Sequence, residues 1–136
     1  MTDKQIIRAI LKGQMQAPAM LSALKDFSHK EQVGPTDHLS CVGMRHQAYA
    51  DFLKVKKTGT AIILIPDPAN PHDEDAVACY VTMPHECEGD YTWVRAGYVA
   101  RNQTHLIRDR DRVYEGKIYR KSHDFWTITA EMVRVF

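Results

Sequence analysis

The stretch Ile65-Pro-Asp-Pro-Ala-Asn-Pro-His-Asp-Glu-Asp-Ala-Val-Ala-Cys-Tyr-Val81 decides how this sequence folds. The stretch begins at the end of one apolar run and ends within a second one, with polar and proline residues between them, so it predicts two β-strands joined by a turn. Pro66, Pro68 and Pro71 fix φ and remove backbone donors, which makes the turn rigid. The Asp73 carboxylate is expected to fold back onto the backbone N–H groups that follow it, as an Asx-turn. Such a turn either has a structural role alone or presents its polar side chains to a ligand.

Segments on both sides of this hairpin have a similar β-rich composition and are bounded by turn residues. They predict a mainly β fold, a small barrel or sandwich of six strands. A short helix over 99–108 would close the barrel. The predicted strands cover residues 39–44, 60–65, 76–82, 91–99, 113–120 and 126–135. In the last strand, alternation predicts a shared buried side for Trp126, Ile128, Ala130, Met132 and Val135.

Residues 1–38 follow a different pattern. Apolar residues recur at helical spacing over 3–12 and again over 18–28, which predicts two short helices. The polar run 29–38 has the composition of a linker. We therefore expect an N-terminal helical extension and linker over 1–38, followed by a β domain over 39–136, so that the whole chain is α+β. The apolar stripe of the helices is expected to pack on the β domain, or else to bind a protein partner.

The composition is that of an ordinary globular protein, with 44% hydrophobic and 26% charged residues. A formal net charge of +1 argues against an extended nucleic-acid surface. The segment from Arg101 to Lys121 contains seven Lys or Arg residues and three acidic residues, which indicates either a local basic strip or a solvated surface of paired charges. No apolar run is long enough to cross a bilayer, and the three cysteines suit a reducing compartment. We expect a cytoplasmic protein with no membrane partner.

Three motifs point to a known family. Asn70-Pro71-His72-Asp73-x-Asp75-Ala76-Val77 is similar to the HIRAN signature Asn-Pro-aromatic/His-Asp-x-Asn-Ala-hydrophobic. Val42-Gly43-Met44-Arg45 is similar to the first strand of that family, and Ala96-Gly97-Tyr98-Val99-Ala100-Arg101 to the segment before its short helix. The motifs occur in the family order and the match spans about 39–136. This resemblance implies a modified, OB-like β-barrel.

The resemblance also implies a site, because DNA-binding HIRAN domains hold the unpaired 3′ end of a strand. Arg45 and His46 match a basic–aromatic pair that contacts the terminal nucleotides, and His72 matches an aromatic residue beside the base and sugar. Asp73 matches a carboxylate that accepts a hydrogen bond from the 3′-hydroxyl, and Arg101 matches a phosphate contact. A carboxylate at that position would favour a 3′-OH over a 3′-phosphate. Histidine in place of tyrosine offers less stacking area and adds a pH dependence.

The resulting expectation is a non-enzymatic module, without metal or cofactor, that binds single-stranded DNA or 3′-OH ends in repair, replication or phage–host conflict. The main alternative is a protein-binding adaptor or inhibitor that uses the barrel and the N-terminal helices. A zinc site from His38, Cys41, His85 and Cys87 has irregular spacing. A magnesium nuclease at 72–75 would need a lysine two residues after its second acid, and valine or aspartate stands there. A nucleophile at Cys79 or Cys87 lacks a base nearby in the sequence, and no Gly-rich phosphate loop is present. The sequence does not predict an oligomeric state.

Overall fold

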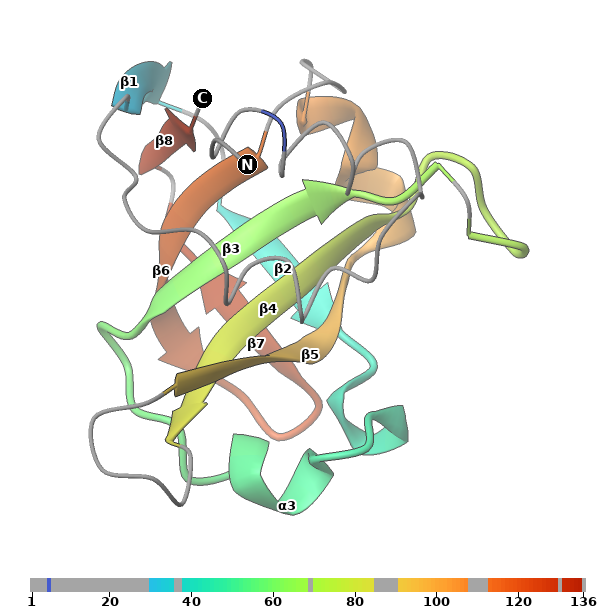
Figure 1. Cartoon of the computed structure of the whole chain (residues 1–136), viewed down its shortest axis with the longest axis vertical. Coiled ribbons are helices and arrows are strands. Elements are labelled where there is room, and N and C mark those ends of the chain that lie inside the picture. Colours follow the sequence, from blue (N-terminus) through green and yellow to red (C-terminus); the bar gives the residue numbers. More distant parts are fainter. Residues whose placement is uncertain are drawn as a thin grey trace.

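The computed structural model of the chain describes Gln5 and residues 30–35, 38–68, 70–84, 91–107, 113–129 and 131–135. Strands dominate these parts of the chain (Figure 1). The strands are β1 (Lys30–Pro35), β2 (Leu39–Val42), β3 (Ala61–Pro66), β4 (Val77–Pro84), β5 (Tyr91–Val99), β6 (Val113–Lys121), β7 (Phe125–Ile128) and β8 (Glu131–Val135). The short helices are η1 (Met44–His46), α3 (Ala50–Leu53) and η2 (Arg101–Leu106). None of the helices in the described ranges is long and apolar enough to cross a membrane.

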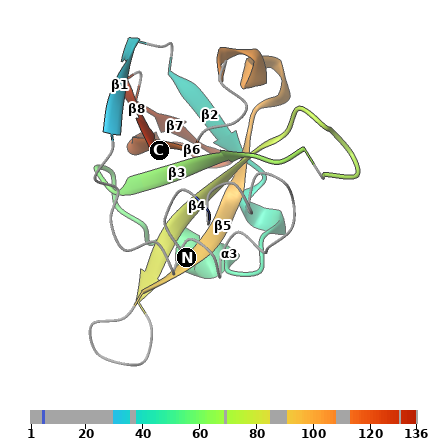
Figure 2. The ribbon, with the colours of Figure 1, turned by 45° about the horizontal axis from the view of Figure 1, so that its top comes forward.

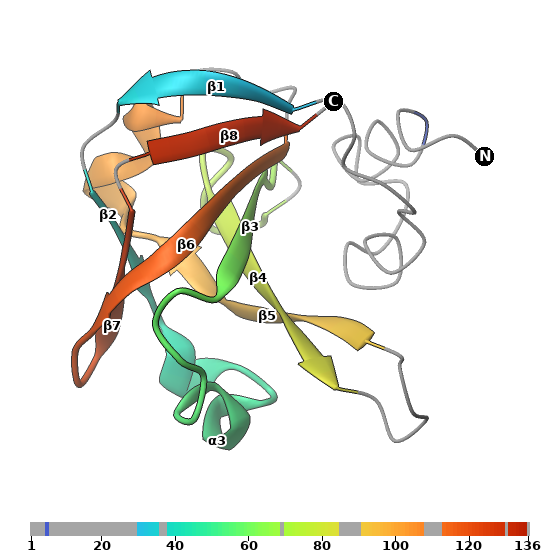
Figure 3. The ribbon, with the colours of Figure 1, turned by 90° about the vertical axis from the view of Figure 1, so that its left-hand side faces the viewer.

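The strands form one antiparallel sheet that closes on itself. Its order is β1-β8-β6-β3-β4-β5-β2-β7, and a further pairing of β6 with β7 closes β2 to β7 into a six-stranded barrel. β1 and β8 continue the sheet beyond β6, outside the ring (Figure 3). The predicted six-stranded barrel with a short helix is thus confirmed. Closure removes the exposed edges that an open sheet of this size would present.

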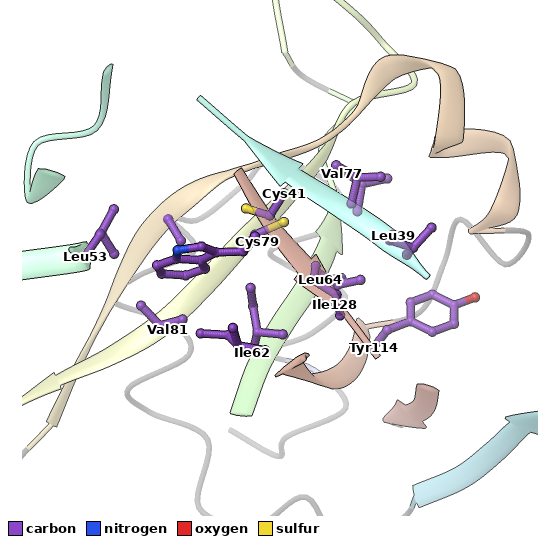
Figure 4. Packing of buried hydrophobic residues seen from close by; sticks show 14 of the residues in the cluster. Leu39, Cys41, Leu53, Ile62, Leu64, Val77, Cys79, Val81, Tyr114 and Ile128 are labelled. Atoms are coloured by element: carbon purple, nitrogen blue, oxygen red, sulfur yellow. The ribbon is translucent and has the colours of Figure 1, made fainter. Parts of the chain in front are cut away.

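Every second residue of β3 and β4 points into the barrel, and the residues between them, among them Ile63 and Ile65, are buried as well. Ile62 and Leu64 of β3 and Val77, Cys79 and Val81 of β4 are fully buried and point into the barrel (Figure 4). The other strands of the barrel and α3 contribute further core side chains, among them Leu39 and Cys41 of β2 and Trp126 and Ile128 of β7. The barrel is therefore filled by side chains, as expected for a small barrel, and functional groups lie on its outside and ends.

The contact between β2 and β5 is unusually close. In β5, Gly97 has φ +155°, and a Cβ atom there would lie 2.2 Å from the carbonyl oxygen of Val42. The pairing of β4 with β5 shifts register between Cys79 and Tyr80, which bends β5 at this point. Glycine is required because no side chain fits between the two strands. This approach fixes the end of β2, and hence the position of η1.

One predicted strand is wrong in its extent. Residues 126–135 were expected to form a single strand, but β7 ends at Ile128 and β8 begins at Glu131. Both pair with β6, whose pairing with β7 shifts register after Ile118. The chain divides here because β7 must bend toward β2 to close the barrel, whereas β8 pairs with β1. Trp126 and Ile128 are buried as predicted, and the side chains at 130, 132 and 135 lie outside the described residues.

The range 29–38 is also different from the expected linker, because it contains β1. Lys30 pairs with Val135 and Pro35 with Glu131, so β8 supplies the backbone partners that the polar sequence did not reveal. A polar strand with proline at its end suits the edge of a sheet. The helices predicted over 3–12 and 18–28 lie outside the described residues, apart from Gln5, which is helical. The division of the chain at residue 38 stays a prediction.

Candidate nucleic-acid interface

The turn between β3 and β4 projects from the barrel and is held by its own backbone (Figures 1 and 2). The N–H of Asp67 donates to the carbonyl of Ala76 at 2.8 Å, which closes the base of the turn. Further out, the N–H of Asn70 donates to Asp67 at 3.1 Å and the N–H of Ala76 to Asp73 at 3.1 Å. The turn is therefore a fixed element that carries His72 and Asp73 at a defined place.

Two side chains of the turn complete this framework. Asp73 Oδ1 accepts from the N–H of Asp75 at 2.9 Å, which confirms the predicted Asx-turn. The Asn70 side chain makes similar hydrogen bonds to the backbone that follows it: its Oδ1 accepts from the N–H groups of His72 at 2.9 Å and Asp73 at 3.2 Å. This role of Asn70 was not predicted from the sequence, although asparagine side chains commonly hydrogen-bond to the backbone two residues on.

The structure brings three of the five predicted site residues together. Arg101, at the start of η2, lies with Nε 3.5 Å from Asp73 Oδ2, and its Nη2 donates to the carbonyl of His72 at 3.4 Å. The Asp73 side chain is 22% exposed and that of Arg101 is 77% exposed. An oriented carboxylate therefore stands beside a solvent-facing guanidinium, with the exposed His72 next to both.

Gln103, which was not among the predicted site residues, fixes η2. Gln103 Oε1 accepts from the N–H of Ser40 at 2.7 Å, and the N–H of Ala100 donates to the carbonyl of Ser40 at 2.8 Å. Both bonds tie the start of η2 to β2. Arg101 is consequently anchored to the barrel on one side of the turn. The sequence held no signal for Gln103, because Ser40 is 63 residues away.

Arg45 and His46 form a separate group on η1. Both are exposed, and Arg45 makes an ion pair with Asp124 in the turn between β6 and β7. Tyr98 of β5 lies between the two groups, since it pairs with Val42 just before η1 and with Ala78 just after the β3–β4 turn. No hydrogen bond or ion pair within the described residues joins Arg45 or His46 to the group of Asp73.

Arg95 organises the surface between the two groups. Its Nε donates to Gln47 Oε1 at 2.6 Å and its Nη1 to the Tyr98 hydroxyl at 2.7 Å, with the guanidinium 5.2 Å from the centre of the Tyr98 ring. Gln47 in turn donates to the carbonyl of Gly43 at 3.2 Å. The cation of Arg95 and the ring of Tyr98 thus lie on β5 next to the residues that follow η1. This arrangement suits contact with a phosphate backbone and bases.

Two other chemistries weighed from the sequence gain no support. No cluster of three His, Cys, Asp or Glu side chains suited to a metal ion occurs among the described residues, and His85 and Cys87 lie outside them. Cys41 and Cys79 are buried free thiols that meet in the core (Figure 4). Burial raises the pKa of the Cys79 thiol well above its ordinary value, so it stays protonated and is a poor nucleophile.

No protein-family model matches the sequence, and no curated protein matches it. Solved structures with a similar fold include a protein from Lactobacillus plantarum, 18% identical, with a TM-score of 0.56 over 78% of this chain and 97% of that chain. They also include the HIRAN domain of human HLTF, 16% identical, with a TM-score of 0.46 over 77% of this chain and 78% of that chain. A HIRAN domain is thus among the structures of similar fold, as the three motifs predicted. Identities this low concern the fold alone.

Proposed function

We propose that this chain is a DNA-binding module without enzymatic activity, and that it recognises the free 3′-OH end of a single strand during repair, replication or phage–host conflict. The observation that carries the proposal is the Asp73–Arg101 pair, held at a distance of 3.5 Å beside a rigid, projecting turn. An acceptor and a cation at neighbouring positions match a terminal hydroxyl and the phosphate that precedes it.

The geometry leaves Asp73 able to accept from a ligand. One oxygen is oriented by the N–H of Asp75, and the other lies 3.5 Å from Arg101, longer than the roughly 2.7–2.9 Å of a charge-assisted hydrogen bond. An ionised carboxylate has about four lone-pair sites, so a hydroxyl can donate to it without displacing Arg101. A 3′-phosphate at the same place would meet the negative charge of Asp73. Discrimination between the two ends follows from that charge.

Exposed rings in both groups, on the β3–β4 turn and on η1, supply contacts with bases. His72 and His46 are both exposed and free to stack on a base, a contact worth roughly 1–3 kcal/mol per base for aromatic side chains. Histidine is smaller than tyrosine, so we expect the lower end of that range. With a formal net charge of only +1, the chain attracts DNA through local contacts rather than through an overall field. Modest affinity and a shallow salt dependence follow.

Fluorescence anisotropy with labelled single strands that end in 3′-OH or 3′-phosphate tests the proposal. The wild-type protein should prefer the 3′-OH strand by about tenfold, the scale of one hydrogen bond to a charged group. Asp73→Asn removes the charge and should reduce this preference, mainly by strengthening binding of the 3′-phosphate strand. Asp75→Asn makes the same charge change in the same turn, at an exposed carboxylate away from Arg101, and should retain the preference.

Equal binding of the two strands by the wild-type protein would refute end recognition. Loss of the preference in Asp75→Asn as well would show that the overall charge of the turn matters, rather than the Asp73 contact. Deletion of residues 1–29 separates this function from a protein-binding role of the N-terminal segment, because it leaves β1 in place on β8. DNA binding should survive that deletion.

A further inference from the structure

A pocket of about 410 Å³ lies at one end of the barrel, between η1, α3 and the turn that joins β6 to β7. Its lining contains none of His72, Asp73 and Arg101. Figures 1 and 3 both place α3 and the β6–β7 turn at the same end of the barrel. The apolar part of its lining includes Met44, Leu53 and Trp126. Its volume falls within the roughly 300–1,000 Å³ that is usual for small-molecule sites.

The charged part of the lining has an excess of positive charge. Arg45, Lys54 and Lys121 line the pocket together with one carboxylate, that of Asp124, so the lining itself has two positive charges in excess. Lys54 also pairs at 3.5 Å with Asp51, which is fully exposed and does not line the pocket, so a ligand can replace this weak ion pair. A phosphate monoester carries about −1.5 to −2 at neutral pH and so matches this excess better than a carboxylate does. The lining therefore combines an apolar wall with a site for a dianion.

One of these cations is held in position by the protein itself. Lys121 Nζ donates to the carbonyl oxygens of Lys54 and Lys56, both at 2.6 Å, and lies 5.8 Å from the centre of the Trp126 ring. An ammonium group has three donors, so one remains for a ligand. The ammonium is fixed before any ligand arrives, which lowers the entropic cost of binding.

Arg45 is held by a group that a ligand can replace. Its guanidinium pairs with Asp124, and the two side chains are 68% and 57% exposed. A guanidinium binds carboxylate and phosphate through the same pair of donors. An ion pair this exposed is weak, because water and salt screen it. A dianion in the pocket would therefore compete successfully with Asp124 for Arg45.

We propose that this pocket binds a phosphate monoester that carries an apolar group of about nucleoside size. The phosphate lies at Arg45 and Lys54, and the apolar group packs against Met44 and the small exposed parts of Leu53 and Trp126. The site is distinct from the Asp73–Arg101 pair and goes beyond end recognition. The same chemistry is found in a free mononucleotide and in the last nucleotide of a strand that ends in a 5′-phosphate, and the experiment separates these two sources.

The test is an NMR titration of the full-length protein with deoxyadenosine 5′-monophosphate, followed at the Trp126 indole N–H and the backbone of α3. Lys54→Ala should weaken binding about threefold, the size of an exposed charge contact. Asp124→Asn should strengthen binding by a similar factor, because it removes the competitor for Arg45. Lys57→Ala makes the same charge change as Lys54→Ala at an exposed lysine that does not line the pocket, and should leave the affinity unchanged.

Deoxyadenosine and inorganic phosphate, each titrated alone, should bind more weakly than the nucleotide if the pocket uses both parts of the ligand. Equal losses in the two lysine variants, weaker binding in Asp124→Asn, or equal binding of deoxyadenosine and its monophosphate would overturn the proposal. A 5′-phosphorylated single strand that shifts the pocket signals while the mononucleotide does not would overturn the small-molecule site and assign the pocket to the strand end. Wild-type preference for 3′-OH strands is measured separately and does not depend on any of these results.

Discussion

Replacement of Gly97 by alanine tests whether the barrel closes as described. Its Cβ would lie 2.2 Å from the carbonyl oxygen of Val42 and 3.2 Å from Cys41 Sγ. The carbonyl belongs to the backbone of β2, which is paired with β5 on one side and β7 on the other, so it has little freedom to move away. Gly59 provides the matched control, because its φ is +85° and nothing lies within 4 Å of a Cβ there.

The expected magnitudes follow from these two environments. Alanine at Gly59 experiences only the cost of a left-handed conformation, about 1–2 kcal/mol, partly offset by a less flexible unfolded chain. Alanine at Gly97 has an unfavourable φ and also overpacks a strand contact, which adds roughly 1–3 kcal/mol. We therefore expect Gly97→Ala to lower the free energy of unfolding by about 3 kcal/mol and Gly59→Ala by about 1 kcal/mol.

Urea unfolding followed by tryptophan fluorescence measures both changes. With a typical slope of about 1–3 kcal/mol per molar urea, the midpoint of Gly97→Ala should fall by one to a few molar, well beyond that of the control. An effect no larger than that of Gly59→Ala would refute the close approach of β2 and β5. A reduced slope, rather than a shifted midpoint, would mean that the native barrel has opened instead.

Two further predictions concern the β3–β4 hairpin. Burial raises the pKa of Tyr80 from 10.0 to about 12, so the unfolded chain loses this proton first as the pH rises. The free energy of unfolding should therefore fall by about 1 kcal/mol between pH 9 and 11. Urea unfolding at both pH values should show a smaller fall in Tyr80→Phe, and an equal fall would contradict the assignment. Asn70→Ala removes the acceptor for the N–H groups of His72 and Asp73, and should lower stability by about 1 kcal/mol in thermal unfolding while abolishing the 3′-OH preference in anisotropy. Asn70→Asp retains the acceptor and should preserve both, so equal damage in the two variants would argue against that hydrogen bond.

The strands of the barrel were predictable because their signals are local. The β-rich composition of the segments and their flanking turn residues located β2 to β6 to within a few residues. The division between β7 and β8 was not predictable, since the alternation continues through it. The break at Thr129 depends on which strands lie on either side of β6, and that is a property of the closed sheet. β1 was missed for the same reason, because its partner β8 lies a hundred residues later.

The contacts within the β3–β4 turn were predictable, and those between elements were not. The Asx-turn at Asp73 follows from residues that are neighbours in the sequence, whereas its approach to Arg101 was implied only by the order of three motifs. The close contact at Gly97 shows why one of those motifs contains glycine. A pattern of residue types can record such a constraint without revealing the carbonyl oxygen that imposes it.

Arg45 is the residue at which an unpredicted contact between elements has the clearest effect on function. The sequence places a cation after the first barrel strand, but its counterion Asp124 lies 79 residues away, in another hairpin. Because the pair is exposed, it stabilises the fold by only about 0–1 kcal/mol, yet any phosphate that uses Arg45 must first displace Asp124. That competition weakens phosphate binding at Arg45 by up to about fivefold, whereas the partner of Arg101, Asp73, is itself part of the proposed site. Cations of similar appearance in the sequence are therefore unequal in the folded chain, and the Asp73–Arg101 pair is the better anchor for a DNA end.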